Sequence, residues 1–402
     1  MISYVIPTRD RPERLALTLA ALGRLAGHPE SARGPLAEVV IVDNASQHPP
    51  TPPARLANGL RVRTIYRCTN EGAASRNAAV AAADPASEWV VMLDDDSHPV
   101  DTGFISRLAR APEDVAAVSA DIWLPGLARR ESGGLPEVFV GCGVAIRRRV
   151  FLDLGGYDPE FNYYAEEYDL AARMILRGYR VEFDPWFRVE HHKVTLHRNQ
   201  NTILARLVRN NGWVMQRYAP ERVRRAQIRE QRRRYRAIAR VEHALDGFAE
   251  GLRELRRTIS AQPRTPMSAE QFDRFCGLAQ AREALAEARH ERPFSTAAVV
   301  DEGKNGWVVR TALTEMGVEV VNPWPWDESP ARAQSETHPD ALVIGTMSPG
   351  PMIDAYERRT LARAGTQSPR VIAPWRVVSH GRGLSVDALV GGPVGASSAK
   401  VL

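Results

Sequence analysis

Three consecutive aspartates form the part of this sequence with the clearest capacity for chemistry. Asp94, Asp95 and Asp96 follow the apolar run Trp89–Leu93, which is typical of a strand buried on both faces. We expect Pro99 to end this strand. Carboxylates at the carboxyl end of a buried strand lie where open α/β sheets bind their ligands. Their mutual repulsion favours a hard divalent cation; the alternative is an acidic turn that faces solvent.

Polar residues that could complete such a site follow two other predicted strands. The strand Ile2–Pro7 leads into Thr8–Arg11, where we expect Asp10 to cap the next helix. The strand Glu38–Val42 ends at Asp43. Because the carboxyl ends of parallel strands meet at one edge of a sheet, these side chains should cluster with the aspartates.

Other segments add a cation and a glycine-rich strand. A strand over Leu60–Tyr66 precedes a small helix that carries Arg76, which could reach a phosphate. The run Phe139–Ile146 is predicted to be a strand, in which Gly141 and Gly143 mark close approach by a ligand or another backbone.

Acidic and imidazole side chains follow later in the chain. Glu166, Glu167 and Asp169 open a predicted helix. They either interact favourably with the helix dipole or supply a carboxylate base near the metal. Of the pair His191 and His192, one could complete a metal shell; a structural role is the alternative.

The ordered set of these motifs resembles family 2 glycosyltransferases with the GT-A fold, over roughly residues 1–220. The matching segments are Val5–Arg11, Val42–Ser46, Asn70–Gly72, Arg76–Asn77, Leu93–Asp96, Gly141–Gly143, Glu166–Leu170, Arg177–Arg180 and His191–His192.

The resemblance implies a Rossmann-like nucleotide-binding domain, a nucleoside-diphosphate sugar donor and a divalent metal, Mn²⁺ or Mg²⁺. The residues it assigns to the donor are Pro7, Thr8, Arg9, Asp43, Asn70, Arg76, Asp94 and Asp95. The metal is assigned to Asp96 and His192, with His191 as the alternative to His192.

The resemblance also implies an inverting transfer to an acceptor hydroxyl, of which the sequence does not name the class. The catalytic pair of the family is Glu-Asp, whereas this chain has Glu166 and Glu167. We predict Glu167 as the base and Glu166 as the alternative. Gly141, Cys142 and Asp169 are predicted to contact the acceptor.

The segment after the first domain is rich in arginine. Nine arginines and one acid, Glu230, occur between Arg222 and Arg240, a composition that could bind nucleic acid or anionic lipid. Apolar residues recur at steps of three and four from Ile238 to Ile259, which favours a coiled-coil-like seam. We therefore predict an α-helical hairpin as the connector, with Ser268 as the N-cap of its second helix. This hairpin would pack on a neighbouring part of the protein or form a homo-oligomer. Nucleic acid is not an expected partner.

The last part of the chain alternates strands and helices. The strands predicted are Ala297–Val300, Val318–Val321, Ala341–Ile344 and Arg370–Ala373. This pattern indicates a small Rossmann-like α/β domain, whose glycine loops match no phosphate-binding fingerprint. We consider two roles for this domain, which are recognition of the acceptor and assembly of the protein with other subunits.

Bulk properties set the remaining expectations. The length of 402 residues suggests domains at 1–220, 221–292 and 293–402. The sequence has no apolar run of about 18 residues, so we expect no transmembrane helix. No signal peptide is recognisable either, and we expect a cytoplasmic protein. The net charge is +5, with only three lysines.

Two other functions compete with glycosyl transfer. A sugar-nucleotidyltransferase would have a glycine-rich arginine loop after its first strand, which residues 7–11 lack. An inactive nucleotide-sugar-binding scaffold would not need Asp94, Asp96 and Glu167.

Overall fold

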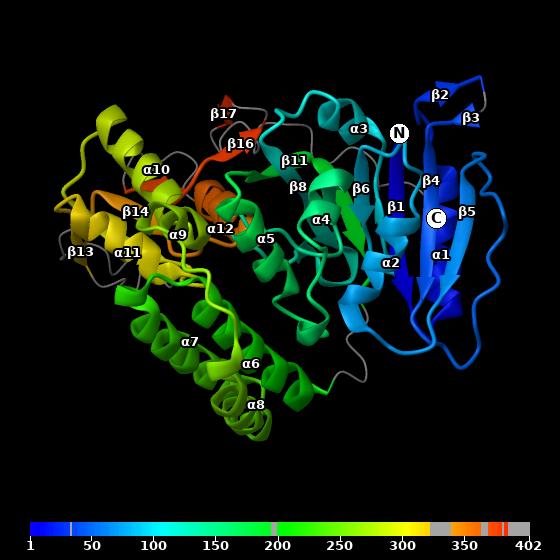
Figure 1. The fold of residues 1–402 in the computed structure, drawn as a ribbon. Coiled ribbons are helices and arrows are strands. Elements are labelled where there is room, and N and C mark those ends of the chain that lie inside the picture. Colours follow the sequence, from blue (N-terminus) through cyan, green and yellow to red (C-terminus); the bar gives the residue numbers. More distant parts are fainter. Residues whose placement is uncertain (33, 194–198, 322–338, 363–368, 380–381, 385–402) are drawn as a thin grey trace.

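The protein, described here from a computed structural model, contains two sheets joined by helices (Figure 1). The structure describes residues 1–32, 34–193, 199–321, 339–362, 369–379 and 382–384. Its α/β class agrees with the prediction. In this part of the chain no helix combines the length and the apolar character needed to cross a membrane.

The larger sheet belongs to the N-terminal part of the chain. Its strand order is β5 (Arg61–Tyr66), β4 (Ala37–Asp43), β1 (Ile2–Thr8), β6 (Trp89–Met92), β10 (Val144–Arg147), β8 (Val115–Leu124), β11 (Arg180–His191) and β7 (Ser97–Pro99), with β9 (Arg129–Arg130) paired to β8. The strands β5, β4, β1 and β6 are parallel, as the βα alternation predicts. A two-stranded ribbon, β2 (Glu30–Ser31) and β3 (Gly34–Pro35), precedes β4.

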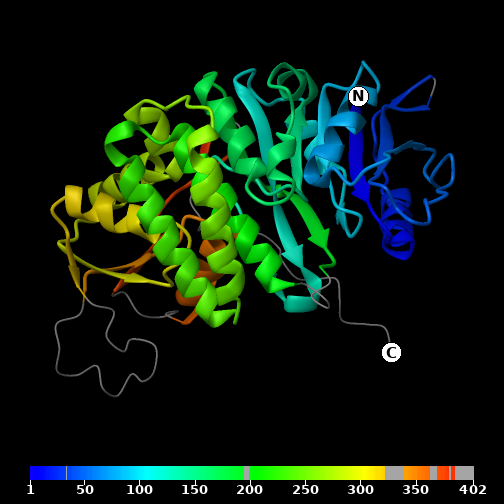
Figure 2. The ribbon, with the colours of Figure 1, turned by 60° about the horizontal axis from the view of Figure 1, so that its bottom comes forward.

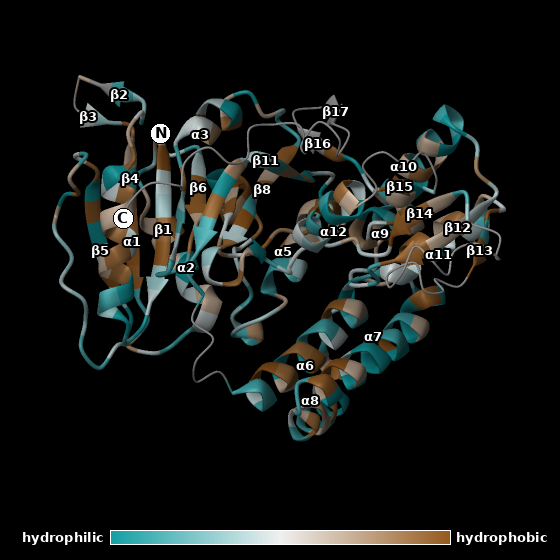
Figure 3. Ribbon diagram, turned by 180° about the vertical axis from the view of Figure 1, so that it is seen from behind, coloured by the Kyte–Doolittle hydropathy of each residue, from teal (hydrophilic) through white to brown (hydrophobic). Residues whose placement is uncertain are grey.

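Helices cover both faces of this sheet because its central strands are apolar on both sides (Figure 3). One face packs on α1 (Pro12–Arg24) and α3 (Gly103–Leu108). The other face packs on α2 (Ser75–Ala82), α4 (Arg148–Asp153) and α5 (Glu166–Leu176). Burying both faces leaves the strand ends as the places where polar groups can gather.

Three local predictions need correction. Pro99 does not end the pairing, because it lies in β7, an edge strand that pairs with β11, where proline is tolerated. Asp10 does not cap α1; its carboxylate accepts from the backbone N–H of Gln47 instead. Residues 139–143 are not in a strand, and only Val144–Arg147 pairs in the sheet.

Five helices follow the first sheet, and the last four of them occupy the stretch 221–292, for which a two-helix hairpin was predicted. They are α6 (Gln200–Tyr218), α7 (Glu221–Val241), α8 (Leu245–Thr258), α9 (Ala269–Cys276) and α10 (Leu278–Glu291). The predicted seam breaks between α7 and α8, where His243 has a positive φ of 51°, and Gly277 with φ 91° separates α9 from α10. The capping box of Ser268 and Gln271 is confirmed.

The second sheet is parallel, in the order β13 (Glu319–Val321), β12 (Thr296–Val300), β14 (Ala341–Ile344) and β15 (Arg370–Ile372). It packs with α11 (Gly306–Glu315) and α12 (Pro349–Ala362), and a short ribbon of β16 (Val377–Ser379) and β17 (Arg382–Leu384) follows it. This confirms the four predicted strands and the small Rossmann-like pattern. The final residues, 385–402, lie outside the described part of the chain.

The two sheets share one continuous apolar core. Arg130 beside β8 pairs with Asp121 and with Asp354 of α12, at 3.0 and 2.7 Å. Phe183 of β11 meets Trp375 edge to face at 6.1 Å. The C-terminal unit is therefore packed on the first sheet, and the division at residues 220 and 292 stays a prediction.

Candidate active site

The aspartate turn is fixed by the strand before it and by one serine after it. Leu93 is fully buried, so the chain emerges from the core at Asp94. The hydroxyl of Ser97 accepts from the Asp94 N–H at 2.8 Å and donates to the carbonyl of Cys142 at 3.0 Å. This double contact ties the turn to the Gly141–Gly143 segment.

Arg11 binds two of the three carboxylates. Its guanidinium lies 2.6 Å from Asp95 and 2.6 Å from Asp96, and Thr8 donates to Asp95 at 2.9 Å. Burial raises the pKa of Asp95 to about 7, against the effect of Arg11. Burial alone would raise the pKa of Asp96, but hydrogen bonds from His191 and Arg11 lower this pKa to about 2. The turn therefore holds fewer than three full charges at neutral pH.

Arg76 of α2 brings a buried cation to Asp94. It pairs with the Asp94 carboxylate and donates to the carbonyl of Leu93 at 3.1 Å. Its side chain is 6% exposed, whereas that of Asp94 is 38% exposed. The Nε atom of Arg76 has no hydrogen-bond partner among the described residues. A buried donor without a partner is costly, so this guanidinium could still bind an anionic ligand.

His191, at the end of β11, lies against the same turn. Its Nε2 is 3.2 Å from Asp96, and its Nδ1 is 3.2 Å from Glu131 and 3.4 Å from the Cys142 sulfur. Burial disfavours the imidazolium form, but Cys142, Asp96 and Glu131 together raise the pKa of His191 to about 12.

The backbone N–H of His192, the residue predicted to bind the metal, donates to the Asp96 carbonyl at 2.8 Å, but its ring contacts other residues. Its Nε2 is 3.3 Å from Glu190, and its ring stacks on His98 at 5.5 Å. Successive side chains along an extended segment point to opposite sides, so only one of the two histidines can face Asp96. The structure places His191 there.

The donor atoms around the turn fit a hard divalent cation. Atoms of Asp94, Cys142 and His191 lie within 4.8 Å of one another. The 3.2 Å between Asp96 and His191 is an ion pair in this structure, so a cation bound by both residues would have to replace the imidazole proton. Carboxylate and imidazole suit Mn²⁺ or Mg²⁺. Burial raises the pKa of the Cys142 thiol, which makes this sulfur a poor ligand for such an ion.

Two adjacent glutamates begin α5 near this cluster. Glu166 is buried, and its Oε2 has no partner among the described residues. Burial and then the charge of Glu167 raise the pKa of Glu166 well above its usual value. Burial also raises the pKa of Glu167, while hydrogen bonding to the Gly141 backbone and the charges of Arg76 and Lys304 oppose the shift. Glu167 is the more exposed of the two.

A strained loop, Phe161–Ala165, presents these glutamates. Tyr164 and Ala165 have positive φ of 72° and 68°, a conformation that costs energy for residues other than glycine. The buried amide of Asn210 in α6 compensates: its Nδ2 lies 3.0, 2.9 and 2.7 Å from the carbonyls of Phe161, Tyr163 and Tyr164. The sequence analysis missed Asn210, although a polar residue on the apolar face of a helix was a signal.

Lys304, which follows β12 of the second sheet, is a further residue that the sequence analysis missed. Its Nζ lies 4.5 Å from the ring centre of Tyr168. Burial and the charge of Arg234 lower the pKa of Lys304 to about 7, against the opposing effect of Glu167. The C-terminal unit thus brings a basic group close to the glutamate pair.

The predicted donor residues at the other strand ends are held together by their loops. The Asp43 carboxylate accepts from the Ser46 N–H at 3.2 Å. Asn44 donates its backbone N–H to the Thr8 carbonyl at 2.9 Å and its amide to Asn70 at 3.0 Å. These contacts bring Thr8, Asp43 and Asn70 to one edge of the sheet.

Pro7 and Arg9 flank Thr8 at the same strand end. Pro7 pairs with Val42 inside the sheet. Arg9 is exposed and lies 3.5 Å from Asp10.

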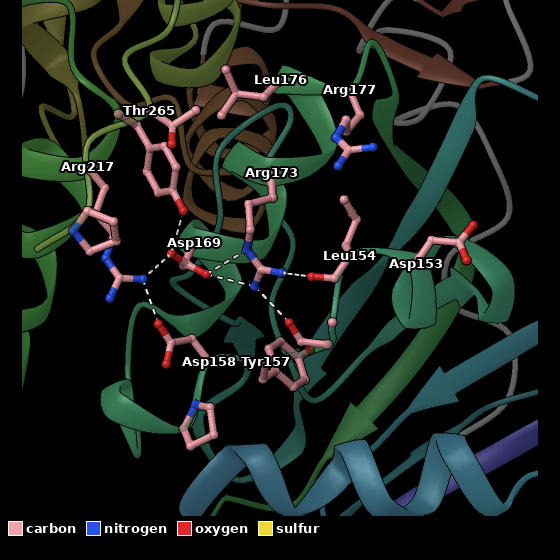
Figure 4. A pocket seen from close by; sticks show the side chains of 15 residues that line it. Asp153, Leu154, Tyr157, Asp158, Asp169, Arg173, Leu176, Arg177, Arg217 and Thr265 are labelled. Carbon is pink, nitrogen blue, oxygen red and sulfur yellow. Dashed lines mark hydrogen bonds and ion pairs between the residues drawn. The ribbon is translucent and has the colours of Figure 1, made fainter.

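Among the predicted acceptor residues, Gly141 and Cys142 adjoin the cluster, but Asp169 does not. A Cβ atom on Gly141 would be 3.1 Å from Glu167. Asp169 is fully buried, and Arg173, Arg217 and Tyr218 donate to its carboxylate at 2.6–2.9 Å (Figure 4). With both oxygens used in this way, Asp169 has a structural position rather than one that could bind an acceptor.

Comparison with known proteins gives a family match for the N-terminal part of the chain. Residues 3–151 match the family described as "Glycosyl transferase family 2". The O-antigen biosynthesis protein RfbC of Myxococcus xanthus is 27% identical over 236 residues, which are 48% of this chain and 17% of RfbC. The chain therefore spans about a sixth of that relative.

Two solved structures show low similarity to this chain. S. aureus TarS 1–349 in complex with UDP-GlcNAc has 15% identity, a TM-score of 0.47, and coverage of 79% of this chain and 92% of that chain. The mannosyltransferase PcManGT of Pyrobaculum calidifontis, in complex with GDP-Man and Mn²⁺, has 15% identity, a TM-score of 0.41, and coverage of 82% and 88%.

The match to glycosyl transferase family 2 covers residues 3–151, in the N-terminal part of the chain for which the resemblance was predicted. The mixed α/β sheet described above agrees with the fold class predicted for that region.

Proposed function

We propose that this protein transfers a sugar from a nucleoside-diphosphate sugar to an acceptor hydroxyl, with inversion and with the help of a divalent cation. The observation that carries the proposal is a convergence of charged groups from four elements. The aspartate turn after β6, Arg76 of α2, His191 of β11 and the glutamates of α5 lie around one end of the sheet. Residues 3–151, which include most strands of that sheet, match glycosyl transferase family 2.

The donor would bind where Arg76 meets Asp94. The unpartnered Nε of Arg76 could donate to a diphosphate oxygen, and Thr8 and Asp43 lie at the adjoining strand ends for the nucleoside. Asp96 and His191 are the residues we assign to the cation. When bound, the cation would act as a Lewis acid that offsets charge on the leaving diphosphate.

Glu167 is the base that we assign to the acceptor. It is more exposed than Glu166, so a substrate hydroxyl can reach it. Its carboxylate would take the hydroxyl proton as the oxygen attacks the anomeric carbon. The bond to the diphosphate breaks on the opposite side of that carbon, and this single displacement inverts the configuration. A pKa above that of an ordinary glutamate suits proton transfer near neutral pH.

Labelled donors test this proposal. The full chain would be incubated with uridine, guanosine and thymidine diphosphate sugars and Mn²⁺, and release of nucleoside diphosphate would be followed with and without candidate acceptors. We expect turnover of the donor with one of the three nucleobases. The variant Glu167→Gln should lose this turnover, whereas the control Glu113→Gln, at an exposed position, should keep it. Exchange of sugar phosphate would instead indicate a nucleotidyltransferase, and binding without turnover would indicate a scaffold.

A further inference from the structure

One face of α7 carries a straight stripe of exposed arginines. The stripe consists of Arg222, Arg225, Arg229, Arg233, Arg236 and Arg240. The intervals of three and four residues place them on one side of the helix, over about 27 Å at about 1.5 Å per residue. Among the described residues, only Arg233 of these six makes an ion pair, at 3.6 Å from Glu230.

A neighbouring face of α7, about a quarter turn around the helix from the stripe, is used inside the chain. Ile228, Tyr235 and Ala239 are buried there, and Tyr235 and Ala239 pack in a small core with residues of α6. The helix is therefore held against the protein with its arginines outward. Figure 3 shows how much of α7 is hydrophilic, and Figure 2 shows that α6, α7 and α8 form one prominent side of the molecule.

Two exposed aliphatic side chains stand at one end of the stripe. Val241 ends α7 and is 75% exposed, and Leu245 begins α8 and is 50% exposed. They belong to the predicted apolar seam, but the break at residues 242–244 turns them away from the small core. A cationic stripe that ends in exposed aliphatic residues is a combination that binds anionic bilayers.

We propose that this face, the arginine stripe with Val241 and Leu245, docks the protein on an anionic membrane surface. The arginines would lie against lipid phosphates, and the two aliphatic side chains would enter the headgroup region. Nucleic acid is the less favoured occupant, because single-strand binding uses exposed aromatic platforms and the only aromatic residue of α7, Tyr235, is 5% exposed. The proposal does not depend on the transferase activity.

The carboxyl ends of β1 and β4 point toward the same side of the molecule as α7 and α8 (Figure 1).

Co-sedimentation with vesicles tests the proposal. The full chain would be mixed with phosphatidylcholine vesicles with or without about 30% phosphatidylglycerol. We expect binding only to the anionic vesicles, weakened as salt rises because the Debye length shortens. Each basic residue near such a surface strengthens binding about fivefold, so the triple variant Arg229→Gln, Arg233→Gln, Arg236→Gln should bind about 100-fold more weakly.

The matched control removes the same charge from other exposed positions. Arg24→Gln, Arg149→Gln and Arg177→Gln together should leave most of the vesicle binding intact. Val241→Ser with Leu245→Ser should weaken binding that persists in high salt. Equal loss in the stripe variant and the control would overturn the proposal, because it would reduce the effect to net charge.

Two other results would also overturn it. A short RNA or DNA duplex that binds more tightly than the vesicles, and competes with them at the stripe, would identify nucleic acid as the occupant. A change from dimer to monomer in the Val241→Ser, Leu245→Ser variant, without a change in vesicle binding, would identify a second copy of the chain. Retained folding of each variant would be checked by its thermal transition.

Discussion

Replacing Asn210 by alanine tests whether α6 positions the catalytic loop. The amide Nδ2 of Asn210 lies within 3.0 Å of three loop carbonyls, and the residue is fully buried. Each hydrogen bond contributes about 1 kcal/mol net, and a buried acceptor left unpaired costs more. We expect Asn210→Ala to lower the free energy of unfolding by about 2–4 kcal/mol.

Asn210→Ala should also lower the rate of the catalysed reaction. Without the amide, the left-handed pair Tyr164 and Ala165 can relax, and the start of α5 with Glu167 moves. A displacement of about 1 Å at a reacting group costs roughly 100-fold in rate, so kcat should fall by about that factor while the Kd for the donor changes little.

Asn211 provides the control, because it is the next residue, is 6% exposed and donates to the Leu207 carbonyl at 2.9 Å within α6. Asn211→Ala should lower stability by about 1 kcal/mol and leave kcat within about threefold. Chemical denaturation and steady-state turnover at a temperature where both variants are folded would measure the two effects. Loss of stability in Asn210→Ala with kcat close to wild type would refute the positioning role.

Four further predictions concern the acidic residues of α5 and the nearby Lys304. Glu167→Gln should stop transfer and leave donor affinity unchanged in calorimetry, whereas Glu166→Gln should keep most of the turnover; the reverse pattern would make Glu166 the base. Because the pKa of Glu167 is raised, and because a base acts only after losing its proton, kcat/KM should rise with pH at values above those of an ordinary glutamate. Lys304→Met removes a positive charge that lowers the pKa of Glu167, so the rise of kcat/KM should occur at higher pH. An unchanged pH profile would mean that Lys304 does not affect the base. Asp169→Asn should destabilise the fold by about 3 kcal/mol, since it weakens a buried network of charged donors, without changing the KM for the acceptor; a large rise in that KM with normal denaturation would restore the predicted acceptor role.

The aspartate turn was predictable because its signal is local. An apolar run followed by acids defines a buried strand end, and β6 with Asp94–Asp96 has that form. The choice between the two histidines also had a local signal. Phe187, Val189 and His191 alternate with polar residues in β11 and are all buried, so this alternation marks His191 as the histidine that faces inward.

Other features depend on contacts that sequence spacing does not contain. Asn210 meets the loop before α5 from a helix nearly 50 residues later, and Lys304 reaches Tyr168 from a different sheet. Asp169 looked like a site residue because it lies two positions after Glu167. Two residues correspond to about 200° around the helix axis, so Asp169 lies on the other side of α5, where Arg217 and Tyr218 donate to its carboxylate.

The central claim is that Asp96 and His191 hold a cation beside a nucleoside diphosphate, and calorimetry tests it most directly. The nucleoside diphosphate selected by the donor panel would be titrated into the full chain with and without Mn²⁺, and then into Asp96→Ala. We predict that Mn²⁺ tightens binding at least about tenfold in the wild-type protein, and that this gain disappears in Asp96→Ala. Equal tightening in both proteins, or no effect of Mn²⁺ in either, would contradict the account.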